Sequence, residues 1–296
     1  MAKRYSDCVQ ALIIGCGYVG EALGQRLVAL GHDVTGIRRS RQHNDRLTQL
    51  GIRPLNLDIT REGALANLDN RYDWVVIAAS SARGGEAAYK QVFELGTRQL
   101  AQWLKASTPS SSVFISSTNV YRQTNTELVA EKDSDTTGKI LGKAEQIISE
   151  TGSSVAILRS SGIYGPNRGH QFRQFMSGNA VVEGNGSRYL NMVHRDDLVT
   201  AIIWTLENDG DSGIFNITDD EPVTQLDFFQ WLSITTGRPM PPFGPEPDTT
   251  VHKRGITNKR VSNKLFKETF GFGYSYPTFR EGLTVELNRL TKCKTN

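Results

Sequence analysis

Three glycines near the N-terminus have the spacing of a loop that holds a phosphate group. They belong to the run Gly15-Cys16-Gly17-Tyr18-Val19-Gly20. In such a loop the first glycine permits a tight turn, the second lets the backbone approach a pyrophosphate, and the third lets a helix pack against a strand. The start of that helix adds backbone amides and a favourable dipole for an anion. We expect all six residues of the run to bind a dinucleotide.

The sequence around this run has the elements that such a loop requires. An apolar stretch at residues 11–14 is typical of a buried strand, residues 21–30 carry apolar side chains at helical spacing, and residues 34–37 form a second apolar stretch. A Gly-x-Gly-x-x-Gly pattern alone is a weak signal, because a glycine-rich turn can form without any ligand. The strand, loop, helix and second strand in this order favour the dinucleotide-binding interpretation.

The residues after the second strand bear on which dinucleotide binds. An NAD-specific protein carries a carboxylate at this strand end, where it accepts hydrogen bonds from the ribose hydroxyls. Here Arg38 takes that position, with Arg39 beside it and Arg41 nearby. Guanidinium groups match the geometry of a phosphate, so we expect NADP in preference to NAD. The alternative is a solvated basic loop that binds nothing.

Two further strand ends supply candidate cofactor contacts. Asp58 follows an apolar segment, where its carboxylate either accepts from an adenine amine or caps a following helix. Ala78, Ala79 and Ser80 end a later strand, and their small side chains either leave room for the cofactor or simply pack well. We include all four among the candidate cofactor-binding residues.

Short apolar runs recur along the chain at the spacing of alternating strands and helices. Strands are expected at residues 74–78, 113–116 and 155–158, and crossover helices at residues 90–105 and 139–150. Because strands that alternate with helices form parallel sheets, the pattern predicts an α/β fold with a Rossmann-type doubly wound parallel sheet.

The alternation loosens after about residue 165, where short strands and a Gly-Asn-rich loop follow. We therefore expect residues 1–165 to form an NAD(P)-binding domain. Residues 166–296 are expected to form a smaller, discontinuous substrate-binding part, with segments at about 191–220 returning to the sheet.

Composition excludes several classes of protein. The 296 residues carry a net charge of +3 and include 38% hydrophobic and 22% charged residues, as an ordinary globular protein does. The basic residues are scattered, so we expect no nucleic-acid partner. Three distant cysteines, Cys8, Cys16 and Cys293, predict neither a disulfide framework nor a metal site. With no apolar stretch long enough to span a membrane and no signal peptide, we expect a cytoplasmic protein.

Taken together, several motifs are similar to those of a known superfamily. They are the glycine run and the segments at residues 114–121, 158–166, 191–198, 258–263 and 276–283. With them the chain resembles the extended short-chain dehydrogenase/reductases of NAD-dependent epimerase/dehydratase type. The likeness implies that Ser116, Gly162 and Ile163 lie beside the cofactor and that Ser117 orients the substrate. It also implies a small-molecule substrate, and homodimerisation is common in the family.

The chain departs from the family at its catalytic residues. Extended members usually separate the first two loop glycines by two residues, whereas Gly15 and Gly17 are separated by one, as in atypical branches. The family's Tyr-x-x-x-Lys pair is also lost, because Thr137 and Leu141 stand at its two positions. Leucine leaves no cation to lower the pKa of a proton donor.

The chain offers two other tyrosines as candidate proton donors. Tyr121 and Tyr164 both follow strands whose carboxyl ends line the cleft in such folds. Each tyrosine either transfers a proton from its hydroxyl or only lines the pocket with its ring, and the sequence favours neither alternative. Lys139 and Lys143 are interpreted as solvated helix lysines.

The candidate substrate contacts also differ from those of the family. Dehydratases carry an acid pair at the positions of Thr118 and Asn119, whose side chains cannot perform that proton transfer. Nucleotide-sugar members carry a diphosphate-binding Arg at the position of Leu190. The remaining candidates, which lie on the same strand and just after it, are Arg188, Asn191 and His194.

Two functions fit these residues. The first is an atypical NAD(P)-dependent oxidoreductase or epimerase, with Ser117 and one of the tyrosines acting on a hydroxyl or carbonyl of a small polar or sugar-like substrate, nucleotide sugars included. The second is a non-catalytic NADP(H)-binding redox sensor or regulatory protein, which the loss of the catalytic pair favours.

Overall fold

The computed structural model describes residues 8–81, 84–134, 139–208, 212–246 and 257–292. The chain divides into two compact units, both discontinuous in sequence. Unit 1 consists of Met1–Val120, Thr136–Arg159 and Val199–Phe215, and unit 2 of Tyr121–Asp135, Ser160–Leu198 and Asn216–Asn296. This division differs from the expected boundary at residue 165, because residues 121–135 and 160–165 belong to unit 2. Residues 199–215, which belong to unit 1, lie within the segment that was expected to return to the sheet.

Unit 1 is built on a seven-stranded sheet with the order β12-β7-β5-β4-β1-β2-β3. The strands are β1 (Gln10–Ile14), β2 (Asp33–Arg38), β3 (Arg53–Asn56), β4 (Trp74–Ile77), β5 (Ser111–Ser117), β7 (Val155–Ser160) and β12 (Ile214–Ile217). The neighbours from β5 to β3 pair in parallel. The predicted Rossmann-type sheet is thereby confirmed.

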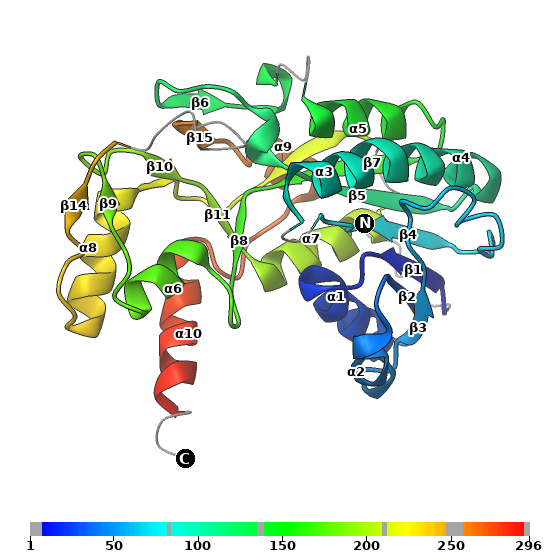
Figure 1. Ribbon diagram of the computed structural model, residues 1–296, viewed down its shortest axis with the longest axis horizontal. Helices are drawn as coiled ribbons and strands as arrows, with labels where there is room; N and C mark the ends of the chain where they lie inside the picture. The colour runs from blue at the N-terminus through cyan, green and yellow to red at the C-terminus, as the bar shows by residue number, and fades with distance from the viewer. Residues whose placement is uncertain (1–7, 82–83, 135–138, 209–211, 247–256, 293–296) are drawn as a thin grey trace. The chain divides into compact units, whose positions relative to one another are not determined.

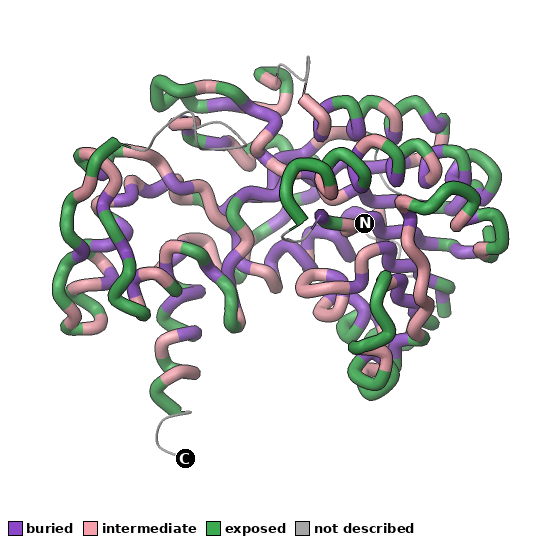
Figure 2. The backbone as a smooth tube through the Cα atoms, viewed as in Figure 1, coloured by how far each residue is buried: buried purple, intermediate pink, exposed green. Residues whose placement is uncertain are grey.

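Helices cover both faces of this sheet, with α3, α4 and α5 over one face and α1, α2 and α7 over the other (Figure 1). They are α1 (Tyr18–Ala29), α2 (Asn44–Gln49), α3 (Gly85–Lys90), α4 (Thr97–Ser107), α5 (Ile140–Ser149) and α7 (Arg195–Glu207). Short turns η1 (Arg41–His43) and η3 (Thr118–Val120) follow β2 and β5. Because both faces are covered, β4 and β7 are buried along their whole length, as the purple tube in Figure 2 shows.

One predicted helix is interrupted. The expected helix at residues 90–105 begins earlier, at Gly85, and contains a π-helical segment, η2 (Gln91–Gly96), between α3 and α4. Val92, Phe93 and Gly96 of this segment are buried, and Gly96 packs closely against Ile59. Tertiary packing therefore widens the helix where the sequence pattern indicates a regular one.

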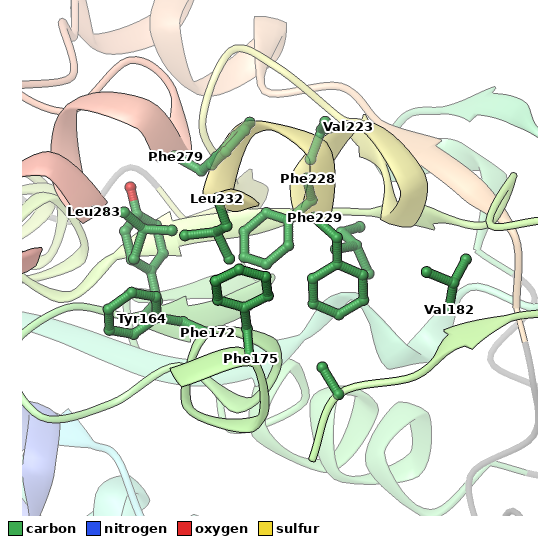
Figure 3. Close-up of a cluster of buried hydrophobic side chains, with 12 residues drawn as sticks. Tyr164, Phe172, Phe175, Val182, Val223, Phe228, Phe229, Leu232, Phe279 and Leu283 are labelled. Carbon is green, nitrogen blue, oxygen red and sulfur yellow. The ribbon is translucent and has the colours of Figure 1, made fainter. Parts of the chain in front are cut away.

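Unit 2 holds short paired strands and an aromatic core. Its elements are β6 (Glu127–Val129), η4 (Glu131–Asp133), β8 (Gly162–Tyr164), α6 (His170–Met176), β9 (Val182–Glu183), β10 (Tyr189–Leu190), β11 (Met192–His194), β13 (Val223–Thr224), α8 (Gln225–Thr236), β14 (Phe243–Gly244), β15 (Lys259–Val261), α9 (Lys264–Phe270) and α10 (Phe279–Lys292). Tyr164, Phe175, Phe228, Phe229 and Phe279 pack in one cluster from several of these elements (Figure 3). This core binds segments together that are far apart in sequence.

None of the described helices combines the length and the apolar character that a membrane crossing requires.

Candidate functional site

The glycine run forms the turn between β1 and α1, in the middle of the sheet. The sheet is extended in two directions from β1: β2 and β3 follow on one side, and β4, β5, β7 and β12 on the other. The turn after β1 is therefore at the point where the strand order reverses. The carboxyl ends of parallel strands at such a switch point are where α/β folds bind ligands. The backbone amides of Gly15 and Cys16 both donate to the carbonyl oxygen of Ile37, at 3.1 and 2.9 Å. These bonds fix the turn against the end of β2.

Gly15 and Gly20 are required by close backbone approaches. Gly15 has φ +96°, and a Cβ added to it would lie 2.6 Å from the carbonyl carbon of Ala78 and the amide nitrogen of Ala79. A Cβ on Gly20 would lie 2.8 Å from the carbonyl oxygen of Gly15. Ala78 and Ala79, which we considered as cofactor contacts, are thus also the surface on which the loop rests.

Gly17 differs from the other two glycines of the run. A Cβ added to it would meet no atom of the described residues within 4 Å. Gly17 is also the N-cap of α1 and, as a glycine, has no side chain that could cap this helix end. Helix N-termini carry unsatisfied amides and partial positive charge. An open glycine backbone at a helix N-terminus has the shape and polarity that a pyrophosphate requires.

The Cys16 side chain points into the protein. It is fully buried, and its Sγ would lie 2.7 Å from a Cβ on Gly36. Burial raises the pKa of the Cys16 thiol to about 12, so the thiol is neutral and unreactive at physiological pH. Cys16 can therefore serve a ligand only through its backbone.

At the end of β2, two arginines share one carboxylate. Arg38 donates to one oxygen of Glu21 and Arg46 donates to the other, each at 2.6 Å. Arg39 is exposed. Glu21 lies in the first turn of α1, and its role was missed from sequence because the contact joins residues 17 positions apart. Arg38, Arg46 and Glu21 together carry one net positive charge beside the glycine loop.

Asp58 closes a turn after β3, and no helix begins there. Its carboxylate accepts from the backbone amide and the hydroxyl of Thr60, at 3.0 and 2.7 Å. Burial alone raises the pKa of Asp58, but these hydrogen bonds, with Arg39 and Arg61 nearby, hold that pKa below its ordinary value. The carboxylate is ionised at neutral pH. Residues 60–65 form turns and a bend, so the alternative in which Asp58 caps a following helix is wrong.

The two serines at the end of β5 have different environments. Ser116 is buried and donates its hydroxyl to Glu145. Glu145 in turn accepts from Arg159 at 2.7 and 3.0 Å, and both charged side chains are almost completely buried. Ser117 is only half-buried, and its Oγ accepts from the backbone amide of Asn119 at 3.2 Å. The Ser116 hydroxyl is therefore structural, whereas Ser117 is presented at the carboxyl end of the strand.

A lysine reaches the same turn. Lys139 donates from Nζ to the carbonyl oxygen of Asn119 at 2.6 Å. Leu141, at the family's lysine position, is buried with 5% of its surface exposed, and Thr137 lies outside the described residues. The interpretation of Lys139 as a solvated helix lysine is wrong, because its ammonium is held against the turn that carries Ser117.

Both candidate tyrosines are buried in unit 2. Tyr121 is fully buried and donates to Oδ1 of Asn216 at 2.7 Å. The Tyr164 hydroxyl donates to the carbonyl oxygen of Thr278 at 3.3 Å and packs against Gly282. Burial, with Asp219 and Asp197 nearby, raises the pKa of Tyr164 far above its ordinary value. These environments argue against proton donation and favour the alternative in which the rings are packing residues.

The candidate substrate residues of unit 2 are also engaged in local contacts. Arg188 donates to Glu183 at 2.7 and 2.9 Å. The side-chain amide of Asn191 makes two hydrogen bonds to the backbone of β15. It donates to the carbonyl oxygen of Lys259 and accepts from the backbone amide of Val261. These contacts account for both side chains as parts of the fold.

His194 is 3% exposed, and its ring packs against that of Tyr276 in a tilted arrangement, with the centroids 3.8 Å apart. Its Nδ1 accepts from the backbone amide of Asp196 at 3.2 Å. Burial lowers the pKa of His194 to about 4, although Asp196 acts in the opposite direction. The imidazole is therefore neutral at physiological pH. Gly162 and Ile163, the candidate cofactor residues of this unit, form β8 and pair with Met192 and Val193 of β11.

Comparison with known proteins connects these features to one family. The model of the NAD-dependent epimerase/dehydratase family matches residues 11–218. Protein YeeZ of Escherichia coli strain K12 is 27% identical over 273 residues, covering 90% of this chain and 95% of YeeZ. Two solved structures share the fold. Bordetella bronchiseptica WbmG in complex with NAD has a TM-score of 0.81 at 15% identity and covers 98% of this chain and 96% of its own. The UDP-glucose 4-epimerase of Thermotoga maritima with UDP-glucose has a TM-score of 0.79 at 20% identity, covering 95% and 99%.

Proposed function

The chain belongs to the NAD-dependent epimerase/dehydratase family, and from this premise we propose that it is an atypical NAD(P)-dependent oxidoreductase or epimerase. The observation that carries the proposal is the open backbone at Gly17, where α1 begins. The loop lies at the switch point of the sheet, where a dinucleotide of this family would bind. WbmG, which has the same fold, was solved with NAD.

We propose that NADP(H) is preferred over NAD(H). Arg38 takes the strand-end position at which an NAD-specific protein carries a carboxylate, and Arg39 beside it is exposed. A 2′-phosphate carries about two negative charges, and guanidinium groups are its best protein partners. Glu21 reduces the positive charge of this cluster without cancelling it, since Arg46 shares the same carboxylate.

The chemistry would take place at the end of β5. When bound, the cofactor supplies hydride transfer. Ser117 is the residue that would orient the oxygen of the substrate, because its Oγ already accepts from the amide of Asn119 and its own proton is thereby directed toward another acceptor. The buried tyrosines take no part in this proposal.

The substrate is proposed to be a small polar or sugar-like alcohol or carbonyl compound. The Thermotoga maritima enzyme was solved with UDP-glucose, which makes nucleotide sugars one group to test. Two features favour a substrate without a diphosphate. Leu190 replaces an arginine, and the neighbouring Arg188 is neutralised by Glu183.

Cofactor binding and turnover test the proposal in two steps. Titration with NADPH, NADH and their oxidised forms should give saturable binding, tightest for the phosphorylated pair. A panel of sugars, nucleotide sugars and small carbonyl compounds is then tested for turnover. An oxidoreductase should change the nicotinamide absorbance, whereas an epimerase, which returns the hydride to its substrate, should convert a panel member into its epimer with no net change in absorbance. Ser117→Ala should reduce that turnover at least tenfold and leave the cofactor Kd unchanged. Absence of any dinucleotide binding would refute the proposal.

A redox sensor is the second candidate, favoured by the lost Tyr-x-x-x-Lys pair and by the burial of Tyr121 and Tyr164. It predicts tight binding of NADP(H) with no turnover on any member of the panel. It also predicts a partner protein whose affinity depends on the ratio of NADP⁺ to NADPH.

A further inference from the structure

We propose that Lys139 supplies the positive charge at the nicotinamide end of the site and makes the protein bind the reduced cofactor in preference to the oxidised one. The inference rests on the proposed function, because it needs a bound dinucleotide. It concerns a residue outside the family's catalytic positions.

The first support is the place of Lys139 in the fold. Its Nζ lies 2.6 Å from the carbonyl oxygen of Asn119, while the amide of the same Asn119 donates to Ser117. The ammonium and the serine hydroxyl are thus connected through one residue of η3. The ammonium is held there by a hydrogen bond and is not a freely rotating surface charge.

The second support is the order of the strands. From one side of the sheet to the other, the described strand ends run from β2 through β1 and β4 to β5. Arg38 ends β2 and the glycine loop follows β1, so an adenine ribose at β2 and a pyrophosphate at the loop direct the other half of a dinucleotide toward β4 and β5. Lys139 therefore lies at the end opposite to the arginines.

The third support is a local cost in stability. Lys139 is the N-cap of α5, with φ −92° and ψ 132°. Helix N-caps favour Ser, Thr, Asp or Asn, and the positive end of the helix dipole disfavours a cation. Helix stability alone gives no reason for a lysine at this position, whereas a role for its charge in the site does.

The physical consequence follows from the charges of the nicotinamide ring. The oxidised ring carries one positive charge and the reduced ring is neutral, so a nearby ammonium repels only the oxidised form. With two charges in a partly solvated site, the effect on the ratio of the two dissociation constants is about three- to tenfold. Lys139 thus favours the state of the site in which the cofactor is reduced.

The test compares dissociation constants and needs no substrate. Kd is measured for NADP⁺ and NADPH, by calorimetry and by nicotinamide fluorescence, in the parent protein and in Lys139→Met, Lys139→Arg and Lys143→Met. Lys143 is a matched control, because it lies on the same helix and is exposed. We expect the ratio of Kd for NADP⁺ to Kd for NADPH to fall three- to tenfold in Lys139→Met only.

Other results overturn the inference in distinguishable ways. If Lys139→Met changes both dissociation constants by the same factor, or neither, Lys139 does not discriminate the redox states. If Lys143→Met gives the same change, the effect comes from general surface charge. If Lys139→Met fails to fold, Lys139→Gln carries the same comparison. If the parent protein binds neither form, the proposed function itself is refuted and the inference falls with it.

Discussion

Two alanine substitutions in the glycine loop should separate folding from binding. Gly15→Ala places a Cβ 2.6 Å from the backbone of Ala78 and Ala79 at a residue with φ +96°. The left-handed conformation and the backbone overlap together cost about 2–4 kcal/mol. Gly17→Ala places its Cβ in a space that is empty of described atoms to 4 Å. It should leave stability within about 0.5 kcal/mol of the parent.

The two variants should behave in opposite ways in two assays. In thermal unfolding, Gly15→Ala should lower the Tm by roughly 5 °C or more, and Gly17→Ala should leave the Tm almost unchanged. In titration with NADPH, Gly17→Ala should raise the Kd at least tenfold, which is about 1.4 kcal/mol of binding free energy. The reason is that the new methyl group occupies the space through which the pyrophosphate approaches the backbone. If Gly17→Ala binds NADPH as tightly as the parent, the assignment of the pyrophosphate to this turn is refuted.

Three further predictions concern other parts of the structure. Glu21→Gln removes the charge that neutralises Arg38 and should raise the preference for NADPH over NADH about three- to tenfold; equal preference in both proteins would contradict this. Arg159→Met leaves Glu145 as an unpaired buried charge and should destabilise the protein by about 3–5 kcal/mol in denaturant unfolding, whereas the additional change Glu145→Leu should restore part of the loss. His194 has a pKa of about 4 in the folded protein, so the unfolded chain, at about 6.5, takes up the proton first as pH falls. Stability should therefore decrease by up to about 3 kcal/mol between pH 6.5 and 4, and His194→Phe should flatten this dependence.

The sheet could be predicted from sequence because its strands are short apolar runs. β1, β4 and β7 contain the apolar runs Ala11–Ile14, Trp74–Ile77 and Val155–Leu158, and every residue of these runs is buried. The π segment at Gln91–Gly96 could not be predicted, since it depends on the packing of Gly96 against Ile59, which lies far away in sequence. The spacing of apolar residues indicates which side chains are buried, but it gives no information on contacts between residues that are far apart in the sequence.

The site was predictable only where the signal is local. The glycine loop is such a case, because the turn, the strand and the helix are contiguous. The environment of Tyr121 depends on Asn216, 95 residues later, and that of Tyr164 on Thr278, 114 residues later. A sequence pattern therefore leaves a catalytic tyrosine and a packing tyrosine indistinguishable. Lys139 was missed for the same reason, as its partner Asn119 lies 20 residues earlier.

The central claim is that the Gly15–Gly20 turn holds the pyrophosphate of NADP(H). A crystal structure of the protein with NADP⁺ bound tests it most directly. We predict pyrophosphate oxygens within hydrogen-bonding distance, about 3 Å, of the backbone amides at the start of α1 and a 2′-phosphate beside Arg38 or Arg39. A dinucleotide bound away from this turn, or a crystal grown at saturating NADP⁺ with the turn empty, would contradict the account.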